Sequence, residues 1–424
     1  MKKRIGLTLF CLVWFGYNSI SFAAKIFIPM DSDGQHNHLK AYGIAYAALK
    51  MGLTADWLLN YQGGSFAMNQ DESIERMCKL RGVDYQILSD AQYAHVISEI
   101  ANPDFNGDVI KLEKPPKICV YTPNNKLPWD DAVTLVLTYA EIPYDKVYDD
   151  EVLDGKLAEY DWLHLHHEDF TGQYSKFLMY RNTAWYQEDV RVQEAMAAKH
   201  GFKKVSQLKL AVAKKIREFV AGGGFMFAMC SATDTYDIAL DAQNTDICDV
   251  PYDGDPMDKD AQQKLDFTQG FAFKDFTISQ NAYDGEFSNI DNTMFRNGRV
   301  PMESDYFSLF TFSAKFDPVP TMLCQNHTTT IKGFMGLTTA FRKEVLKTNV
   351  LVMGDYKPMN EARYIHGEYG KGTWSFYGGH DPEDYQHLIG DPPTDLSLHP
   401  TSPGYRLILN NVLFPAAKKK PRKT

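Results

Sequence analysis

Residues 222–237 read GGGFMFAMCSATDTYD, and this stretch decides the fold. Residues 225–229 form a short run without a polar side chain, directly after three glycines. A run of this length and flanking predicts a strand buried on both faces, as in a parallel sheet. The small and capping residues after Cys230, with Thr233 or Asp234 as N-cap, predict a sharp turn into a helix. We therefore expect Cys230 at the carboxyl edge of a sheet, where open α/β folds bind ligands.

The position of Cys230 allows two interpretations. Beside a helix N-terminus its thiol is expected to have a lowered pKa and to be a competent nucleophile. The alternative is a small buried apolar residue, as most free cysteines are. Five cysteines remain beyond Cys11, and in an exported protein an odd number leaves at least one thiol unpaired. Cys230 is the expected free thiol, and the sequence does not determine the pairing of the other four.

Both ends of the 424-residue chain are expected to lie outside the fold. A basic start, an apolar core and a small-residue cleavage site predict a signal peptide over residues 1–24, hence a periplasmic or secreted protein. Residues 416–424 form a basic tail that is expected to fray. No other apolar run approaches the roughly 20 residues of a membrane span, so no membrane insertion is expected.

The net charge of the chain limits the classes of partner that it is expected to bind. The formal net charge is −10, and loss of Lys2, Lys3 and Arg4 with the signal peptide makes it −13. Such an acidic surface argues against nucleic acid and anionic membranes as partners. The expected partner is a small-molecule, peptide or glycan substrate, and the sequence does not predict the oligomeric state.

Alternating strands and helices predict an α/β protein with two units. Residues 25–113 form an N-terminal α/β domain, with 102–116 read as the linker, and residues 117–415 form a doubly wound, mostly parallel sheet with an insertion at about 241–297. Strands are predicted at 25–30, 55–59, 85–88, 117–121, 144–148, 160–165, 225–229 and 349–353, and helices at 38–51, 72–80, 91–100, 130–140, 190–199, 207–221 and 405–413.

A late β-hairpin brings a histidine to a second strand end. Residues 362–368 and 373–377 are its predicted arms, and 369–372 (YGKG) its turn. The second arm continues into Gly378-Gly379-His380-Asp381-Pro382-Glu383, so His380 follows a strand as Cys230 does.

A strand ending in Cys230, followed late in the chain by a hairpin ending in His380 and then Glu383, resembles the class I glutamine amidotransferase-like superfamily. The resemblance implies a flavodoxin-like sheet, Cys230 as nucleophile, His380 as base and Glu383, or Asp381, as the carboxylate that orients the imidazole. It also implies oxyanion stabilisation by the amides of Ser231 and of the turn near Gly172. In some relatives a carboxyl group beside the cysteine tunes its pKa, and the resemblance implies this role for Glu168. Two departures are that Ala228 and Ala232 replace the family's glycines, and that Glu383 lies one residue later than expected.

Two further stretches, WLLNYQGGS (57–65) and LHLHHEDF (163–170), resemble a group of exported Bacteroidetes proteins often labelled asparagine synthetase B. Such synthetases carry a cysteine at the mature N-terminus and a Ser-Gly-Gly-x-Asp-Ser loop for ATP, and this sequence has neither. We therefore predict a cysteine-dependent hydrolase or amidase that needs no cofactor. Gly63, Gly64, His166 and His167 are predicted to bind its substrate, although two adjacent glycines are also typical of a simple turn.

The histidine-rich segment offers a rival site. His164 and His166 share one strand face, because side chains alternate along a strand. With His167 beside them they are an alternative zinc site; the other interpretation is a hydrogen-bonded cluster without metal. Glu168 and Asp169 do not match the His-x-His-x-Asp-His pattern of metallo-β-lactamase-type enzymes. A third hypothesis is a catalytically silent protein that binds ligands or glycans through its aromatic residues, which make up 13% of the chain.

Overall fold

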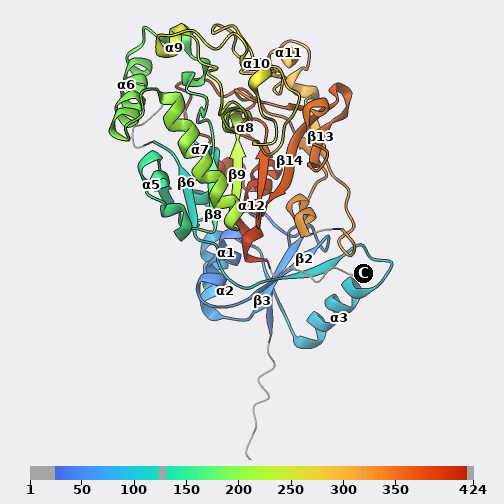
Figure 1. Ribbon diagram of the computed structural model, residues 1–424. Coiled ribbons are helices and arrows are strands. Elements are labelled where there is room, and N and C mark those ends of the chain that lie inside the picture. The colour runs from blue at the N-terminus through green and yellow to red at the C-terminus, as the bar shows by residue number, and fades with distance from the viewer. Residues whose placement is uncertain (1–23, 124–129, 318, 418–424) are drawn as a thin grey trace, which may run out of the picture.

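The computed structural model describes residues 24–123, 130–317 and 319–417. The predicted signal peptide up to Ala23 and the basic tail from Lys418 lie outside these residues. The described chain forms two sheets, one of five strands and one of ten (Figure 1).

The five-stranded sheet is built from the N-terminal unit and has the strand order β4-β1-β3-β2-β5. All its neighbouring strands are antiparallel. Its strands are β1 (Lys25–Ile28), β2 (Ala55–Leu59), β3 (Ser65–Asn69), β4 (Gln86–Leu88) and β5 (Asp108–Leu112), and its helices are α1 (His38–Lys50), α2 (Glu72–Arg81) and α3 (Asp90–Ala101).

Strand β5 corrects one sequence prediction. It lies inside residues 102–116, which were predicted to be a linker, and it pairs along its whole length with β2. Its sequence DVIKL contains only three apolar residues, so the segment alone gives a weak strand signal. Pairing with a neighbouring strand, which is a tertiary contact, determines its conformation.

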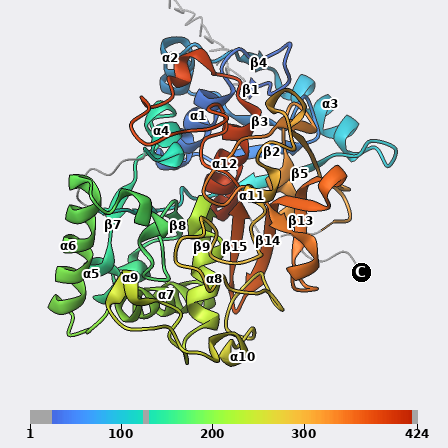
Figure 2. The same ribbon diagram turned by 90° about the horizontal axis from the view of Figure 1, so that it is seen from above.

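The second sheet is mixed, with the order β11-β10-β13-β14-β15-β9-β8-β6-β7 and β12 paired to β14. The half from β7 to β15 is parallel, as predicted, whereas β10 to β14 pair antiparallel. Figure 2 shows β8, β9, β15, β14 and β13 side by side in that order. The strands are β6 (Ile118–Tyr121), β7 (Asp145–Val147), β8 (Trp162–Leu165), β9 (Phe225–Met229), β10 (Tyr306–Leu309), β11 (Thr330–Lys332), β12 (Phe341–Arg342), β13 (Leu351–Tyr356), β14 (Glu361–Tyr369) and β15 (Gly372–Tyr377).

Strand β9 separates two apolar cores, as a strand buried on both faces should. Phe227 and Met229 belong to the core that contains α12 and α1, while Met226 and Ala228 belong to the core that contains α7. The remaining helices are α4 (Ala132–Tyr139), α5 (Asp149–Leu153), α6 (Ala184–Lys199), α7 (Val205–Gly222), α8 (Asp234–Asp241), α9 (Val250–Asp253), α10 (Ala261–Lys264), α11 (Thr293–Arg296) and α12 (Pro403–Leu413).

Residues 242–297 contain only short helices and irregular backbone. Figure 1 shows α9, α10 and α11 at the end of the molecule opposite the five-stranded sheet. Asp237 of α8 anchors the segment, because its carboxylate accepts hydrogen bonds from the amides of Phe271, Ala272 and Phe273.

Two general features concern the described residues. Their five cysteines are all buried free thiols, with no disulfide among them. Within the same residues, no helix combines the length and apolar character needed to cross a membrane.

Candidate functional site

The cysteine lies on the predicted strand-to-helix turn. β9 ends at Met229, a single 3₁₀ turn covers Cys230–Ala232, and α8 begins at Asp234 with Thr233 as N-cap. Cys230 has a φ of 53°, in the left-handed region that a non-glycine residue adopts only at a cost. Such strained backbone is concentrated at functional sites, because it holds one side chain in a fixed direction. The alanines that replace the family's glycines at 228 and 232 therefore do not prevent the turn.

The expectation of a lowered thiol pKa is wrong. Cys230 is 1% exposed, and this burial raises the pKa of its thiol to about 11. Hydrogen bonds from the backbone amides of Thr338, Leu337 and Ser231 lower the pKa of Cys230, but they offset only part of the effect of burial. Burial also raises the pKa of Cys78 and Cys324 to about 12, and those of Cys119 and Cys248 further. Cys230 thus has the lowest pKa of the five thiols, although in absolute terms it is raised.

A loop from outside the predicted motif covers the thiol. The amide N–H of Leu337 donates to Sγ of Cys230 at 3.2 Å. A Cβ added at Gly336 would lie 3.1 Å from that sulfur and 2.9 Å from the backbone N of His380. The loop therefore passes between Cys230 and the His380 backbone. The two predicted residues follow the adjacent parallel strands β9 and β15, and so lie at the same sheet edge.

Three imidazoles meet beside this loop. Each of His166, His167 and His380 offers a ring nitrogen, and these nitrogens lie within 4.8 Å of one another. The ring centroids of His166 and His380 are 4.4 Å apart, and His387 stacks on His380 at 4.9 Å. His166 follows β8 and His380 follows β15, the two strands that flank β9. The parallel strands thus gather at one edge side chains that are far apart in sequence.

Asp131 supplies the negative charge of the cluster. Its oxygens lie 3.3 Å from Nε2 of His164 and 3.4 Å from Nδ1 of His166. Burial acts to raise the pKa of Asp131, but the two histidines hold it well below its usual range. Burial lowers the pKa of His167 to about 3 and, with His166 beside it, lowers that of His380 well below its ordinary value. The rings of His167 and His380 are therefore neutral at pH 7, and neutral imidazole is the form that accepts a proton or binds a metal ion.

The histidine site differs from the zinc alternative predicted from sequence. That alternative combined His164, His166 and His167, whereas His164 belongs with Asp131 and His166 in a second group of close ligand atoms. The third histidine beside His166 and His167 is His380, not His164. His36 and His38, which repeat the His-x-His spacing, have other partners. His36 pairs with Asp84 at 2.7 Å, and His38 packs on His327 with ring centroids 4.3 Å apart.

The acidic partners predicted for His380 bind elsewhere. Glu383 lies 3.1 Å from Nδ1 of His399, and this pairing engages its carboxylate. Asp381 accepts hydrogen bonds from the Thr394 hydroxyl at 2.8 Å and from the Glu383 amide at 2.9 Å. Sequence spacing places both acids after His380, but the turn directs them toward the segment before α12.

Glu168 also has a different environment from the predicted one. Its carboxyl accepts from the Tyr148 hydroxyl at 3.4 Å, and Tyr148 is bonded in turn to Lys209. Burial raises the pKa of Glu168 to about 8, and Lys209 opposes that shift. Its influence on Cys230 remains a prediction.

The other predicted residues divide into one that joins the site and three that pack elsewhere. The Ser231 amide acts on the Cys230 thiol, and its hydroxyl donates to the carbonyl of His167 at 2.9 Å. Gly172 packs on the N-terminus of α7, where an added Cβ would lie 2.6 Å from the Ser206 nitrogen. Gly63 and Gly64 form the β2–β3 turn, which contacts Arg406 and Gln325 at the junction of the two sheets.

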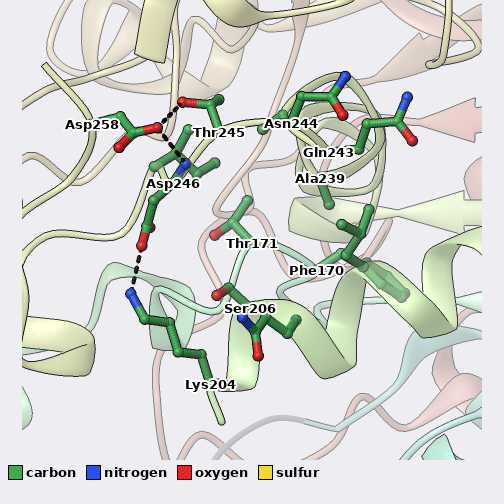
Figure 3. Close-up of a pocket in the computed structure, with 14 residues that line it drawn as sticks. Phe170, Thr171, Lys204, Ser206, Ala239, Gln243, Asn244, Thr245, Asp246 and Asp258 are labelled. Carbon is green, nitrogen blue, oxygen red and sulfur yellow. Dashed lines mark hydrogen bonds and ion pairs between the residues drawn. The ribbon is translucent and has the colours of Figure 1, made fainter. Parts of the chain in front are cut away.

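A pocket of about 330 Å³ is lined by Phe170, Thr171 and residues of α7, α8 and the segment that follows α8 (Figure 3). Hydroxyl, amide and charged groups make up much of its lining, including those of Thr171, Ser206, Lys204 and Asp258. Lys204 donates to Asp246 at 2.5 Å, and Asp258 accepts from Thr245 at 2.9 Å. Cys230 and the three clustered histidines are not among its lining residues.

Sequence reasoning missed Asp131 and Leu337. Asp131 is the N-cap of α4, bonded to the amides of Val133 and Thr134, and it follows β6 at the same edge as Cys230. A capping aspartate after a parallel strand is a signal that was available. Leu337 lies in an irregular segment with no periodic pattern, so the sequence gives no comparable signal for it.

No protein-family model matches this chain, and no curated protein does. Among solved structures, two cytoplasmic proteins from Salmonella typhimurium, STM3548 and STM1381, are similar at 12% identity. The matches cover 72% and 71% of this chain and 100% of each of those chains, with TM-scores of 0.34 and 0.33. A catalytic mutant of Gan42B, a GH42 beta-galactosidase from G. stearothermophilus, matches at 11% identity over 63% of this chain and 28% of its own, with a TM-score of 0.25. Similarity at this level assigns neither a family nor a function.

Proposed function

We propose that this protein is an exported cysteine hydrolase of the glutamine amidotransferase-like type, which cleaves small amides or esters by acyl transfer through Cys230. The observation that carries the proposal is the strained turn at Cys230, with a φ of 53° and an amide N–H 3.2 Å from its sulfur. A turn of this kind directs a nucleophile at the carboxyl edge of a sheet, as the strained elbow does in other acyl-transfer enzymes.

In this mechanism His380 removes the thiol proton as Cys230 attacks the carbonyl carbon. The C–S bond forms and the carbonyl π electrons move to oxygen. When the adduct collapses, the C–N or C–O bond breaks and the leaving group takes the proton from His380. Water then hydrolyses the thioester and regenerates the thiol.

The raised pKa of Cys230 has a consequence for the first step. A thiol with a pKa of about 11 is almost entirely protonated at pH 7. The proton must therefore leave during the attack. His380, which follows the strand beside β9, is the proposed acceptor, and burial lowers its pKa, so it is a weak base in the free protein. Glu383 pairs with His399 through one carboxylate oxygen, and orientation of the His380 ring by Glu383 or Asp381 stays a prediction.

Turnover of small amides and activated esters tests the proposal. Wild-type protein should form a thioester at Cys230 that intact-mass spectrometry detects after rapid acid quenching. Cys230→Ala should abolish both thioester and turnover, and His380→Ala should slow acylation by about 10²- to 10⁴-fold. Cys119→Ala, at another buried thiol, is the matched control and should remain active. Full activity in Cys230→Ala would refute the proposal.

A second candidate, a metal-dependent hydrolase, is supported by the three close imidazole nitrogens of His166, His167 and His380. These residues fit a zinc ion. Zinc prefers neutral imidazole, and Nε2 of His166, a side chain that is 1% exposed, has no hydrogen-bond partner among the described residues. Bound zinc would supply a Lewis acid and a water of lowered pKa. Asp131 would then orient His166, as carboxylates beside metal-binding histidines do.

Metal content separates the two candidates. Protein loaded with zinc and then desalted should retain about one equivalent if the second candidate is right, and His167→Ala should lose it. His200→Ala is the control, because His200 pairs with Asp150 and does not belong to the cluster of His166, His167 and His380. Turnover that survives chelation and requires Cys230 supports the cysteine hydrolase; turnover that chelation abolishes and Cys230→Ala preserves supports the metal enzyme.

A further inference from the structure

We propose that the loop of residues 334–339 serves as the anion site of Cys230, with the backbone amides of Leu337 and Thr338 stabilising negative charge on its sulfur. This inference rests on the proposed function. It assigns stabilisation of charge on the sulfur to a segment more than 100 residues from the cysteine, a role distinct from the oxyanion stabilisation expected of the turn near Gly172.

The contacts at the sulfur carry the first step. The Leu337 amide donates to Sγ at 3.2 Å, and the Thr338 amide also acts to favour the thiolate. Amide N–H groups that are already directed at a developing charge stabilise it without reorganisation during the reaction. In a site that excludes water, each such donor has a larger effect than at the surface.

The loop is itself held on both sides. The Thr338 hydroxyl donates to Oδ1 of buried Asp234 at 2.8 Å, and the Thr339 amide donates to Asp291 at 3.1 Å and to the Thr293 hydroxyl at 2.9 Å. The Met335 and Thr338 carbonyls accept from the amides of His380 and Gly379. Asp234 and Asp291 are thus positioning residues, which hold the amides against the sulfur without contacting it.

The loop also links the sulfur to the rest of the site. Gly336 leaves space for both Cys230 and the His380 backbone, since an added Cβ would lie 3.1 Å from the sulfur. Beside His380 lies His166, a buried side chain whose Nε2 has no hydrogen-bond partner among the described residues. The loop thus contacts both the sulfur and the backbone of His380, whose ring centroid lies 4.4 Å from that of His166.

Two variants at one position test the amide directly. Leu337→Pro removes the N–H, whereas Leu337→Ala keeps it and controls for the loss of the leucine side chain. The readout is the rate of Cys230 alkylation by iodoacetamide between pH 7 and 11, followed by mass spectrometry, which requires no turnover. We expect Leu337→Pro to shift the pH profile upward by about one unit, about tenfold slower at pH 8, and Leu337→Ala to follow wild type.

Coinciding profiles for Leu337→Pro and Leu337→Ala would overturn the proposal. Should Leu337→Pro fail to fold by circular dichroism, Thr338→Val replaces it, with Thr338→Ser as the variant that retains the bond to Asp234. The proposal is supported if Cys230 is alkylated more slowly in Thr338→Val and at the wild-type rate in Thr338→Ser. Equal alkylation rates in the two variants overturn it. If no acyl turnover is found but the alkylation profile still depends on the Leu337 amide, only the proposed function is refuted. The two failures are therefore distinguishable.

Discussion

The sulfur of Cys230 accepts a hydrogen bond from the backbone amide of Leu337, 107 residues further along the chain. The contact joins the end of the central strand β9 to an irregular loop that also packs on the His380 backbone. The amides of Thr338, Leu337 and Ser231 together oppose the effect of burial, which raises the pKa of this thiol less than those of the other four. Thiol chemistry is therefore the most direct test of the site.

Cys230 should be the first cysteine that iodoacetamide modifies in the native protein. The thiolate is the reactive form, and below a pKa of about 11 its fraction rises tenfold with each pH unit. Labelling should accelerate accordingly from pH 7 to 10, and Cys230→Ser should remove it. Peptide mapping is the measurement. If Cys78 or Cys324 were modified first while Cys230 stayed unmodified, Cys230 would have only a structural role.

Replacing Lys209 by methionine should destabilise the fold strongly. Its Nζ is buried and lies 3.1 Å from Asp149 and 3.0 Å from the Tyr121 and Tyr148 hydroxyls. Removing the ammonium leaves a buried carboxylate without a counter-charge, which costs about 3–5 kcal/mol. Urea denaturation measures the difference. Lys215→Met, on the same helix with an exposed Glu218 partner, should change stability by less than about 1 kcal/mol. Equal effects would contradict the buried network.

Asp291 should make stability depend on pH between about 4 and 7. Burial raises the pKa of this carboxyl from 3.8 to about 7. In that window the folded form keeps the proton and the unfolded form loses it, so the free energy of unfolding falls as pH rises. The difference between wild type and Asp291→Asn should therefore change by on the order of 1 kcal/mol per pH unit and become constant above pH 7.

Denaturant titrations at several pH values measure this difference. Asp266→Asn is the control, because hydrogen bonds from Thr268 lower the pKa of Asp266; this variant should give no such slope over the same window. A pH-independent difference between wild type and Asp291→Asn would mean that Asp291 is ionised in the folded protein.

Two glycine-to-alanine changes in helices should have opposite effects. Alanine at Gly43 of α1 would overlap the carbonyl oxygen of Ala140, where α1 meets the end of α4. Alanine at Gly222 of α7 would meet nothing within 4 Å. Helix propensity alone favours alanine at both positions by about 1 kcal/mol. We expect Gly43→Ala to lower the melting temperature and Gly222→Ala to leave it unchanged or raise it. A raised melting temperature in Gly43→Ala would contradict the contact.

The sequence by itself determined many of the elements, though not the strands β3, β10, β11 and β12, and it predicted the edge on which the site lies. The apolar run 225–229, the hairpin up to Tyr377 and the helices around them carry their signals within a few residues, because periodicity, capping and turn chemistry are local. Parallel strands align their carboxyl ends, so Cys230 and His380 had to share one edge once both followed adjacent strands. The strand status of β5 and the antiparallel half of the large sheet were not predictable in this way, because pairing there depends on distant partners.

Only the tertiary structure decided what each of these side chains meets. The pKa of Cys230 is raised because distant segments bury it, although its local position at a helix start predicted the opposite. Glu383 lies three residues after His380, yet the turn directs it to His399. Leu337 and Asp131 complete the site from segments that no motif connects to Cys230. Burial and hydrogen bonding depend on what lies in the surrounding few ångströms, and in a folded chain those atoms come from residues that are far apart in sequence.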